Sequence, residues 1–391
     1  MGQSRIPLAG VIVLFAAVAA GFVPPAGAVR TWRLGGRVVP GPLPPDPYAD
    51  IPAVDLQTDI VYGTAGGREL RLDFAKPVIC GPDKVPLLVY IHGGGWTSGS
   101  KDGVMDSPVA GMAFQLGFAV ASIDYRLAPE WVFPAQVHDC KLAIRYLRKN
   151  ADSLGIDPDR IAAVGGSAGG HLAAILGTAD DDDGLEGPGL PGISSRVSVV
   201  AEYFGPADLT DVDTPLTNEG LAILLAFLGC HPLVCPELAR QASPAAYVTP
   251  DDPPILIAHG ANDELVPYRQ AEIFAERLRS AGNACTLIKV EHAGHSFEPN
   301  PPGSTISPGL AAIGWITMQH LARYLEPGLF GDLNLDGRRN YADFRALLAT
   351  VGLAGVGPNA VSATSDWNPL ADLYPDGVID RRDVEAFLRI K

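Results

Sequence analysis

The chain lacks the excess of positive charge that proteins use to hold nucleic acid or an anionic membrane surface. Its 391 residues include 29 lysines and arginines against 44 aspartates and glutamates, which gives a formal net charge of −15. This balance argues against binding to a polyanion through bulk electrostatic attraction. We therefore expect no nucleic-acid partner.

Long apolar runs are missing beyond the N-terminus. Residues 6–20 form the one extended apolar run, and it is shorter than the roughly 20 apolar residues of a stable membrane span. Arg5 precedes the run and the small residues Ala26-Gly27-Ala28 follow it, a pattern typical of a secretory signal peptide. We expect residues 1–28 to be removed and the protein to be secreted (extracellular, periplasmic or cell-surface) with no membrane span. An uncleaved membrane anchor is the alternative.

Cysteine is scarce, and none of the five cysteines has the spacing of a zinc site. An exported protein meets an oxidising compartment, where Cys230 and Cys235 on either side of a short loop can form a disulfide. The odd total leaves at least one thiol without a partner in the chain. Cys140 is expected to be a small buried apolar residue on a helix.

Eight short β-rich runs alternate with helical patterns. Apolar runs without alternation are typical of strands buried on both faces, and helices between such strands imply parallel pairing with right-handed crossovers. We predict an α/β fold, with an eight-stranded, mostly parallel sheet and helices on both faces. The expected strands are Thr58–Gly63, Glu69–Ala75, Pro86–His92, Ala119–Asp124, Arg160–Gly165, Ser198–Phe204, Pro254–His259 and Thr286–Glu291, and two of the helical patterns are Ala135–Asn150 and Tyr268–Ala281.

This fold is expected to occupy residues 54–326 as one domain, after a Pro- and Gly-rich lead-in over residues 29–53. The connection Gly205–Asp252 is long for a compact domain, and long connections are usually functional or disordered. Its apolar part, Leu221–Leu228, is expected to form a helix covering the active site. Asp208 is interpreted as a loop or capping acid, with reaching the active site as the alternative because it closely follows the strand Ser198–Phe204. Residues 180–183, four consecutive aspartates, are interpreted as a solvated loop.

The strongest catalytic motif is at residues 165–170, which read GGSAGG between a predicted strand and a predicted helix. That placement is the context of a nucleophile elbow, in which a serine occupies a strained strand-to-helix turn. Glycines on either side let neighbouring backbone pass without a clash with Cβ. Ser167 is therefore the candidate nucleophile.

A second glycine-rich segment, residues 92–96 (HGGGW), directly follows another apolar strand. Backbone N–H groups in such a loop can stabilise the oxyanion of a tetrahedral intermediate. We expect the amides of Gly94 and Gly95 to do this together with that of Ala168. Gly93 is the alternative donor in the loop.

A serine needs an imidazole base, and the base needs a carboxylate that orients it. Asp263 follows the predicted strand Pro254–His259, and His295 follows the last predicted strand, so the chain order is Ser, Asp, His. Glu264 is the alternative acid and His292 the alternative base. The predicted chemistry is acyl transfer through Ser167, which requires no cofactor.

These motifs resemble the α/β-hydrolase fold-3 group, which includes the hormone-sensitive-lipase-like esterases. The resemblance covers residues 92–96, residues 124–130 (DYRLAPE) with 133–135 (FPA), residues 165–170, and the segments that contain the acid and the base.

Residues 157–161 (DPDRI) are similar to the feruloyl- and acetyl-esterase-like members of that group. Gly166 stands where the lipase-like enzymes usually have an acid, which favours the polysaccharide-esterase-like branch. The resemblance implies a serine carboxylic ester hydrolase that removes acetyl or feruloyl groups from polysaccharide.

The last part of the sequence carries two acidic loops. Each places oxygen-bearing side chains at the positions that ligate calcium in an EF-hand loop, with a glycine at position six. Tyr374 at position three of the second loop removes one ligand there, so the second site is expected to be weaker. The expected calcium ligands are Asp332, Asn334, Asp336, Asn340 and Asp343 in the first loop, and Asp372, Asp376, Asp380 and Asp383 in the second.

Two such loops, each followed by a helical pattern, resemble a type I dockerin over residues 331–391. The resemblance implies a small all-α module with structural calcium and a cohesin-like protein as a possible partner. The expected substrate is an acylated carbohydrate or another ester. Two alternatives remain open: a general small-ester or lipid esterase with a surface-attachment module, and a non-catalytic binding protein of hydrolase fold.

Overall fold

A computed structural model of the chain describes residues 31–34, 37–40, 52–78, 84–211, 213–214 and 216–326. The predicted signal peptide over residues 1–28 and the predicted dockerin-like module over residues 331–391 lie outside these ranges. Within the expected lead-in, the short strands β1 (Thr31–Leu34) and β2 (Arg37–Pro40) pair antiparallel.

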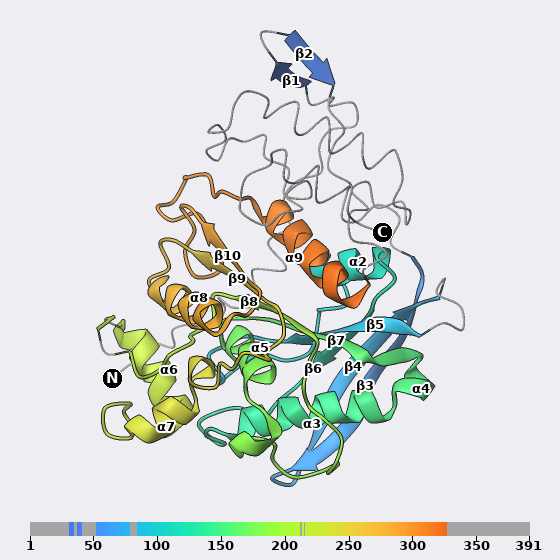
Figure 1. Cartoon of the computed structure of the whole chain (residues 1–391), viewed down its shortest axis with the longest axis vertical. Coiled ribbons are helices and arrows are strands. Elements are labelled where there is room, and N and C mark those ends of the chain that lie inside the picture. Colours follow the sequence, from blue (N-terminus) through green and yellow to red (C-terminus); the bar gives the residue numbers. More distant parts are fainter. Residues whose placement is uncertain are drawn as a thin grey trace, which may run out of the picture.

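The central element is an eight-stranded sheet with strand order β10-β9-β8-β7-β5-β6-β4-β3 (Figure 1). The pairs β3–β4 and β4–β6 are antiparallel, and the other pairs are parallel. All eight predicted strands are present, and the predicted mostly parallel α/β sheet is confirmed. Their bounds are β3 Val54–Ala65, β4 Arg68–Pro77, β5 Val85–Ile91, β6 Ala119–Ile123, β7 Ile156–Gly166, β8 Val199–Tyr203, β9 Ile255–Gly260 and β10 Cys285–Val290.

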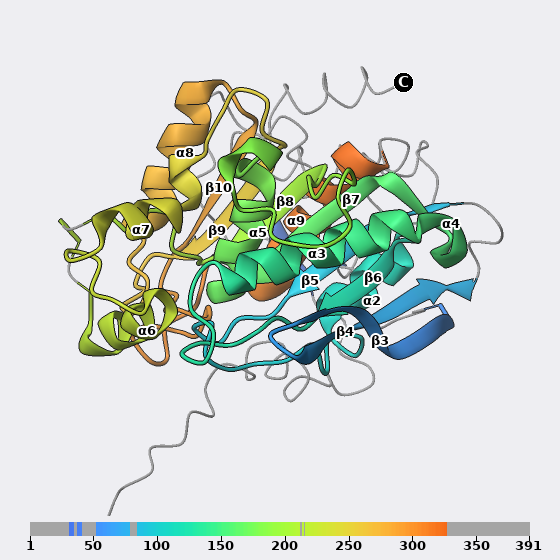
Figure 2. The same cartoon turned by 90° about the horizontal axis from the view of Figure 1, so that it is seen from below.

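Every residue of β5, β6, β8 and β9 is buried, as the uninterrupted apolar runs predict. Two core clusters form because the sheet is covered on both faces (Figure 2). Helices α2 (Pro108–Gln115) and α9 (Leu310–Leu325) pack on one face. Helices α3 (Ala135–Lys149), α5 (Ala168–Thr178) and α8 (Arg269–Ala281) pack on the other.

The connection between β8 and β9 contains α6 (Asn218–Leu228) and α7 (Pro236–Gln241), with a single 3-10 turn (Pro244–Ala246) after them. Helix α6 begins after Thr217, whose side chain accepts a hydrogen bond from the amide of Gly220, and it ends at Gly229 in the left-handed conformation.

The predicted disulfide between Cys230 and Cys235 is present just after α6, and Cys140 is free and buried, as expected. The remaining short elements are α4 (Ala151–Leu154) and a 3-10 turn at Asp181–Asp183. Among the described helices, none combines the length and the apolar character that crossing a membrane would require.

Candidate active site

Three side chains from distant parts of the sequence meet beyond the carboxyl ends of neighbouring parallel strands. Ser167 follows β7, Asp263 follows β9, and His295 follows β10. Because parallel strands all end at the same edge of the sheet, their following loops converge there, and this is where α/β proteins bind ligands. The structure therefore brings together the predicted nucleophile, acid and base.

Ser167 occupies the tight turn that its glycine neighbours predict. Its φ is 56° and its ψ is −122°, and its amide donates to the carbonyl of Tyr203 at 2.8 Å. The turn packs closely against the end of β5. A Cβ on Gly169 would lie 2.1 Å from the carbonyl oxygen of Ile91, and one on Gly165 would lie 2.4 Å from the carbonyl of Gly169. Both positions therefore require glycine.

A continuous row of hydrogen bonds links the three side chains. The Nε2 atom of His295 lies 2.9 Å from the Oγ of Ser167, and its Nδ1 lies 2.8 Å from the Oδ2 of Asp263. With the ring proton on Nδ1 donated to the carboxylate, Nε2 is free to accept the serine proton. The alternatives Glu264 and His292 are both exposed and take no part in this row.

Asp263 is held as a carboxylate by several donors. Its Oδ1 accepts the amides of Leu265 at 2.9 Å and Val266 at 2.8 Å. Burial by itself would raise its pKa, but hydrogen bonds from His259 and His295 outweigh burial and bring the pKa down to about 2. The acid is therefore ionised throughout the neutral range, ready to stabilise an imidazolium.

His259 is a partner of the acid that the sequence did not single out. Its Nε2 lies 3.2 Å from the Oδ2 of Asp263 and 2.7 Å from the carbonyl oxygen of Val266. The ring is fully buried beside the loop that carries the acid. The only signal in the sequence was a histidine four residues before the acid, which is not specific enough to predict the contact.

The glycine-rich loop after β5 lies beside the nucleophile, and Gly94, Gly95 and Ala168 all line the same pocket as Ser167. Gly94 and Gly95 have φ values of 106° and 59°, so the loop depends on glycine. Their amides donate no hydrogen bond within the described ranges, and the amide of Ala168 stands at the first position of α5, where no intrahelical acceptor exists. These groups are free to bind an oxyanion.

The glycine-rich loop after β5 is held in place by contacts between His92 and Tyr125. The ring of His92 stacks on that of Tyr125 with a centroid separation of 4.1 Å, and the Tyr125 hydroxyl donates to the carbonyl of His92 at 2.9 Å. The alternative donor Gly93 does not line the pocket, and its carbonyl faces these anchoring groups at 2.8 Å from His92 Nδ1.

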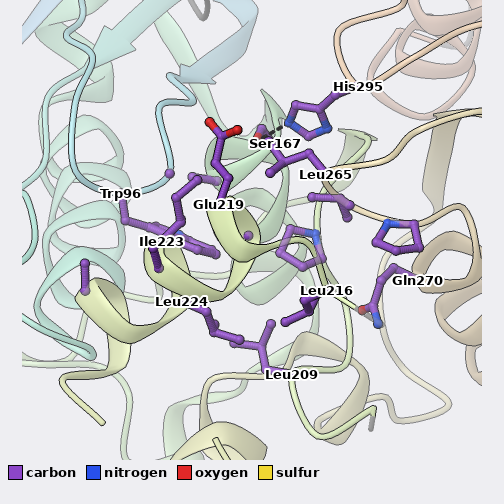
Figure 3. Close-up of a pocket in the computed structure, with 18 of the residues that line it drawn as sticks. Trp96, Ser167, Leu209, Leu216, Glu219, Ile223, Leu224, Leu265, Gln270 and His295 are labelled. Carbon is purple, nitrogen blue, oxygen red and sulfur yellow. Dashed lines mark hydrogen bonds between the residues drawn. The ribbon is translucent and has the colours of Figure 1, made fainter. Parts of the chain in front are cut away.

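A pocket of about 710 Å³ opens beside Ser167 and His295 (Figure 3). As predicted, the apolar segment of the long β8–β9 connection forms a helix, α6, that covers this site. Most of the lining is apolar, but three carboxylates also border the pocket. The apolar side chains include Trp96, Leu209, Leu216, Ile223, Leu224 and Leu265, and the carboxylates are Asp208, Asp211 and Glu219.

Asp208 and the aspartates of residues 181–183 occupy loops and turns, as the sequence predicts. Asp208 accepts the amide of Thr210 at 3.0 Å, as a loop acid does, and it also lines the pocket, which was the alternative for this residue. Residues 181–183 are exposed, as expected of a solvated loop. Within the described ranges no cluster of three potential metal ligands occurs. The predicted calcium ligands, Asp332 to Asp383, lie outside those ranges.

Comparison with known proteins gives a consistent result. A family model described as BD-FAE matches residues 72–278. Among curated proteins, Esterase LipQ of Mycobacterium tuberculosis is 35% identical over 244 residues, covering 62% of this chain and 57% of its own length. Esterase LipC of the same organism is 34% identical, with coverage of 61% and 59%. The chain thus spans somewhat under two thirds of the length of these curated relatives.

Solved structures resemble the described fold as well. A truncated form of a carbohydrate esterase from gut microbiota superposes with a TM-score of 0.58 at 29% identity, covering 63% of this chain and 91% of that structure. Esterase 2 of Thermogutta terrifontis, phosphorylated by paraoxon, gives a TM-score of 0.56 at 29% identity, with coverage of 70% and 95%. Both likenesses extend over nearly the whole of the compared structures.

Proposed function

This chain belongs to the BD-FAE family of α/β-hydrolase esterases, and on that premise we propose that it is a serine carboxylic ester hydrolase. The observation that carries the proposal is the hydrogen-bonded row from Ser167 through His295 to Asp263, which lines a pocket beside free backbone amides. This arrangement contains every group that acyl transfer to serine requires.

In the proposed first half-reaction, the Oγ of Ser167 attacks the ester carbonyl carbon while Nε2 of His295 takes the hydroxyl proton. The negative charge on the carbonyl oxygen is stabilised by the amides of the glycine-rich loop and of Ala168. The carbon–oxygen bond to the alcohol then breaks, and Nε2 returns its proton to the departing alcohol. The acyl group stays on the serine as an ester.

In the second half-reaction, water replaces the alcohol. His295 accepts a proton from the water as its oxygen attacks the acyl carbon, and it then returns that proton to the Oγ of Ser167. The carboxylic acid product leaves and the serine is restored. Asp263 keeps the imidazole oriented and stabilises its charged form in both halves.

We further propose that the natural substrate is an acylated polysaccharide carrying acetyl or feruloyl groups. This finer proposal is supported by the BD-FAE match and by the likeness to a structure titled as a carbohydrate esterase. The apolar lining of the pocket supports the alternative, a general small-ester or lipid esterase. Rates on acetylated and feruloylated xylan compared with tributyrin distinguish the two.

Three features outside the described ranges complete the proposal. We propose that the protein is secreted, that the C-terminal loops bind structural calcium, and that a cohesin-like protein is a possible docking partner. The motifs in the sequence are the support for all three. None of them enters the catalytic steps above.

The nucleophile is tested by Ser167→Ala with p-nitrophenyl acetate as substrate. We expect kcat/KM to fall by at least about a thousandfold, because loss of the nucleophile removes the covalent route. Ser280→Ala, an exposed serine on α8, is the matched control and is expected to keep wild-type activity. Full activity of Ser167→Ala would contradict the assignment, and the absence of any hydrolysis by the wild type would favour a binding protein.

A further inference from the structure

Among the described residues, the carboxylate of Glu219 at the pocket has no hydrogen-bond or ion-pair partner. Glu219 lies in the first turn of α6, is exposed, and lines the same pocket as Ser167 and His295. Figure 3 shows its side chain rising from α6 on the side of the pocket where Ser167 and His295 lie. Within the described residues it makes no hydrogen bond and no ion pair.

No cation balances this charge among the residues that line the pocket. The described lining contains no lysine and no arginine, while Asp208 and Asp211 add two further carboxylates. Those two have nearby partners: Asp208 faces Arg277 at 3.4 Å, and Asp211 faces Gln270 at 3.4 Å. Gln270 is neutral, so Asp211 keeps its charge, and Glu219 is the lining carboxylate that has neither a cation nor a hydrogen-bond donor beside it among the described residues.

The lining residues indicate which part of a bound ester the charge of Glu219 acts on. Leu209 and Leu224 line the pocket and are buried, which suits one apolar substituent of an ester. Glu219 is exposed and marks the mouth of the pocket, so with the carbonyl carbon at Ser167 the other substituent can extend past Glu219 toward solvent. A cleft with low-dielectric walls focuses the field of a charge that borders it.

We propose that Glu219 is a specificity-determining residue that selects against esters with a negative charge on the part extending to the mouth. The carboxylate repels anionic groups there, attracts cationic groups, and accepts hydrogen bonds from neutral hydroxyl groups. The favoured substrates are therefore esters of neutral, hydroxyl-rich alcohols such as neutral sugar units, and esters of uronate-rich chains are disfavoured. This inference rests on the proposed ester hydrolase function and deepens it.

The test uses three acetate esters that differ mainly in the charge of the leaving phenol. They are phenyl acetate, the anionic para-carboxyphenyl acetate and the cationic meta-trimethylammoniophenyl acetate. For each ester, kcat/KM is measured on the wild type and on Glu219→Gln, and the variant-to-wild-type ratio is taken. Differences in leaving-group reactivity cancel, because each ester is compared only with itself.

We expect Glu219→Gln to raise the ratio for the anionic ester about three- to tenfold relative to the neutral ester, and to lower it for the cationic ester by a similar factor. Glu219→Lys moves both ratios further in the same directions. High salt shrinks these differences, because the charge is exposed and screened. Circular dichroism of each variant shows whether the fold is retained.

Asp182→Asn is the matched control. It makes the same change in net charge at an exposed site past the far end of α5 from Ser167, and it should leave all the ratios unchanged. Equal ratios for the three esters in both Glu219 variants, with the wild type active on phenyl acetate, would overturn this inference alone. A wild type inactive on every ester would overturn the proposed function, and this inference with it.

Discussion

Glu202 is a carboxyl group buried beneath the turn that carries Ser167, and it takes no part in the proposed chemistry. Burial raises its pKa to about 7, although the amide of Gly205 donates to it and His259 is nearby. Burial would raise the pKa of Asp263 as well, yet the hydrogen bonds and charges of His259 and His295 bring it down to about 2. Two imidazoles beside Asp263 therefore outweigh burial, whereas burial dominates at Glu202.

Because the pKa of Glu202 is raised in the folded protein, we expect the free energy of unfolding to depend on pH. An unfolded glutamate titrates near about 4.3, so between that pH and about 7 the unfolded chain releases a proton that the folded chain retains. The contribution of Glu202 is fully present below pH 4 and is lost as the pH rises through 7. Over this window the free energy of unfolding should fall by about 4 kcal/mol on account of this group.

Glu202→Gln keeps the shape and the hydrogen-bond acceptor but removes the titration. We expect its free energy of unfolding, measured in guanidinium chloride, to change less than that of the wild type between acidic and alkaline buffers. At alkaline pH the variant should be the more stable of the two proteins. An identical pH dependence for both would show that Glu202 does not titrate in this range.

At the scale of elements, the strand-to-helix turn between β7 and α5 is the part that tolerates least change. Gly169→Ala would place a methyl group 2.1 Å from the carbonyl oxygen of Ile91, so α5 or the end of β5 must shift. We expect a loss of at least about 2 kcal/mol in the free energy of unfolding and at least about a tenfold loss in kcat/KM.

The matched control is Gly309→Ala at the start of α9, where a Cβ meets no atom within 4 Å. Its free energy of unfolding should stay within about 1 kcal/mol of the wild type. If denaturation midpoints and kinetic constants of the Gly169 variant matched those of the control, the close packing beneath Ser167 would not be required.

The elements also show what periodicity can and cannot predict. The strands were predictable because uninterrupted apolar runs such as Val85–Ile91 are typical of strands buried on both faces of a sheet. Helix α6 was predictable as an apolar segment within a long connection. The contact of His259 with Asp263 and the position of Glu219 beside the pocket depend on how separate loops pack together, and no local pattern in the sequence encodes that packing.

At the scale of the whole molecule, the sequence predicted the meeting of Ser167, Asp263 and His295 for a topological reason. Each residue follows a strand, and parallel strands deliver their following loops to one edge of the sheet. The sequence analysis also preferred Asp263 over Glu264 and His295 over His292, and the hydrogen bonds of the structure join the preferred residues.

The proposed calcium module is tested on the full chain by calorimetric titration after removal of metal with a chelator. We expect calcium to bind with higher affinity at the loop that begins with Asp332, because Tyr374 deprives the other loop of a ligand. Asp332→Asn combined with Asp336→Asn should abolish the tighter binding and leave ester hydrolysis intact. Unchanged heats in that variant would refute the assignment of the first loop.

Covalent labelling shows whether Ser167 is the activated nucleophile of an esterase. The wild type is incubated with a fluorophosphonate, and the site of attachment is located by peptide mass spectrometry. We expect a single adduct on Ser167, slowed by a competing ester and absent in His295→Ala, since the serine is then no longer activated. An adduct on another residue, or none while the enzyme hydrolyses esters, would contradict this expectation.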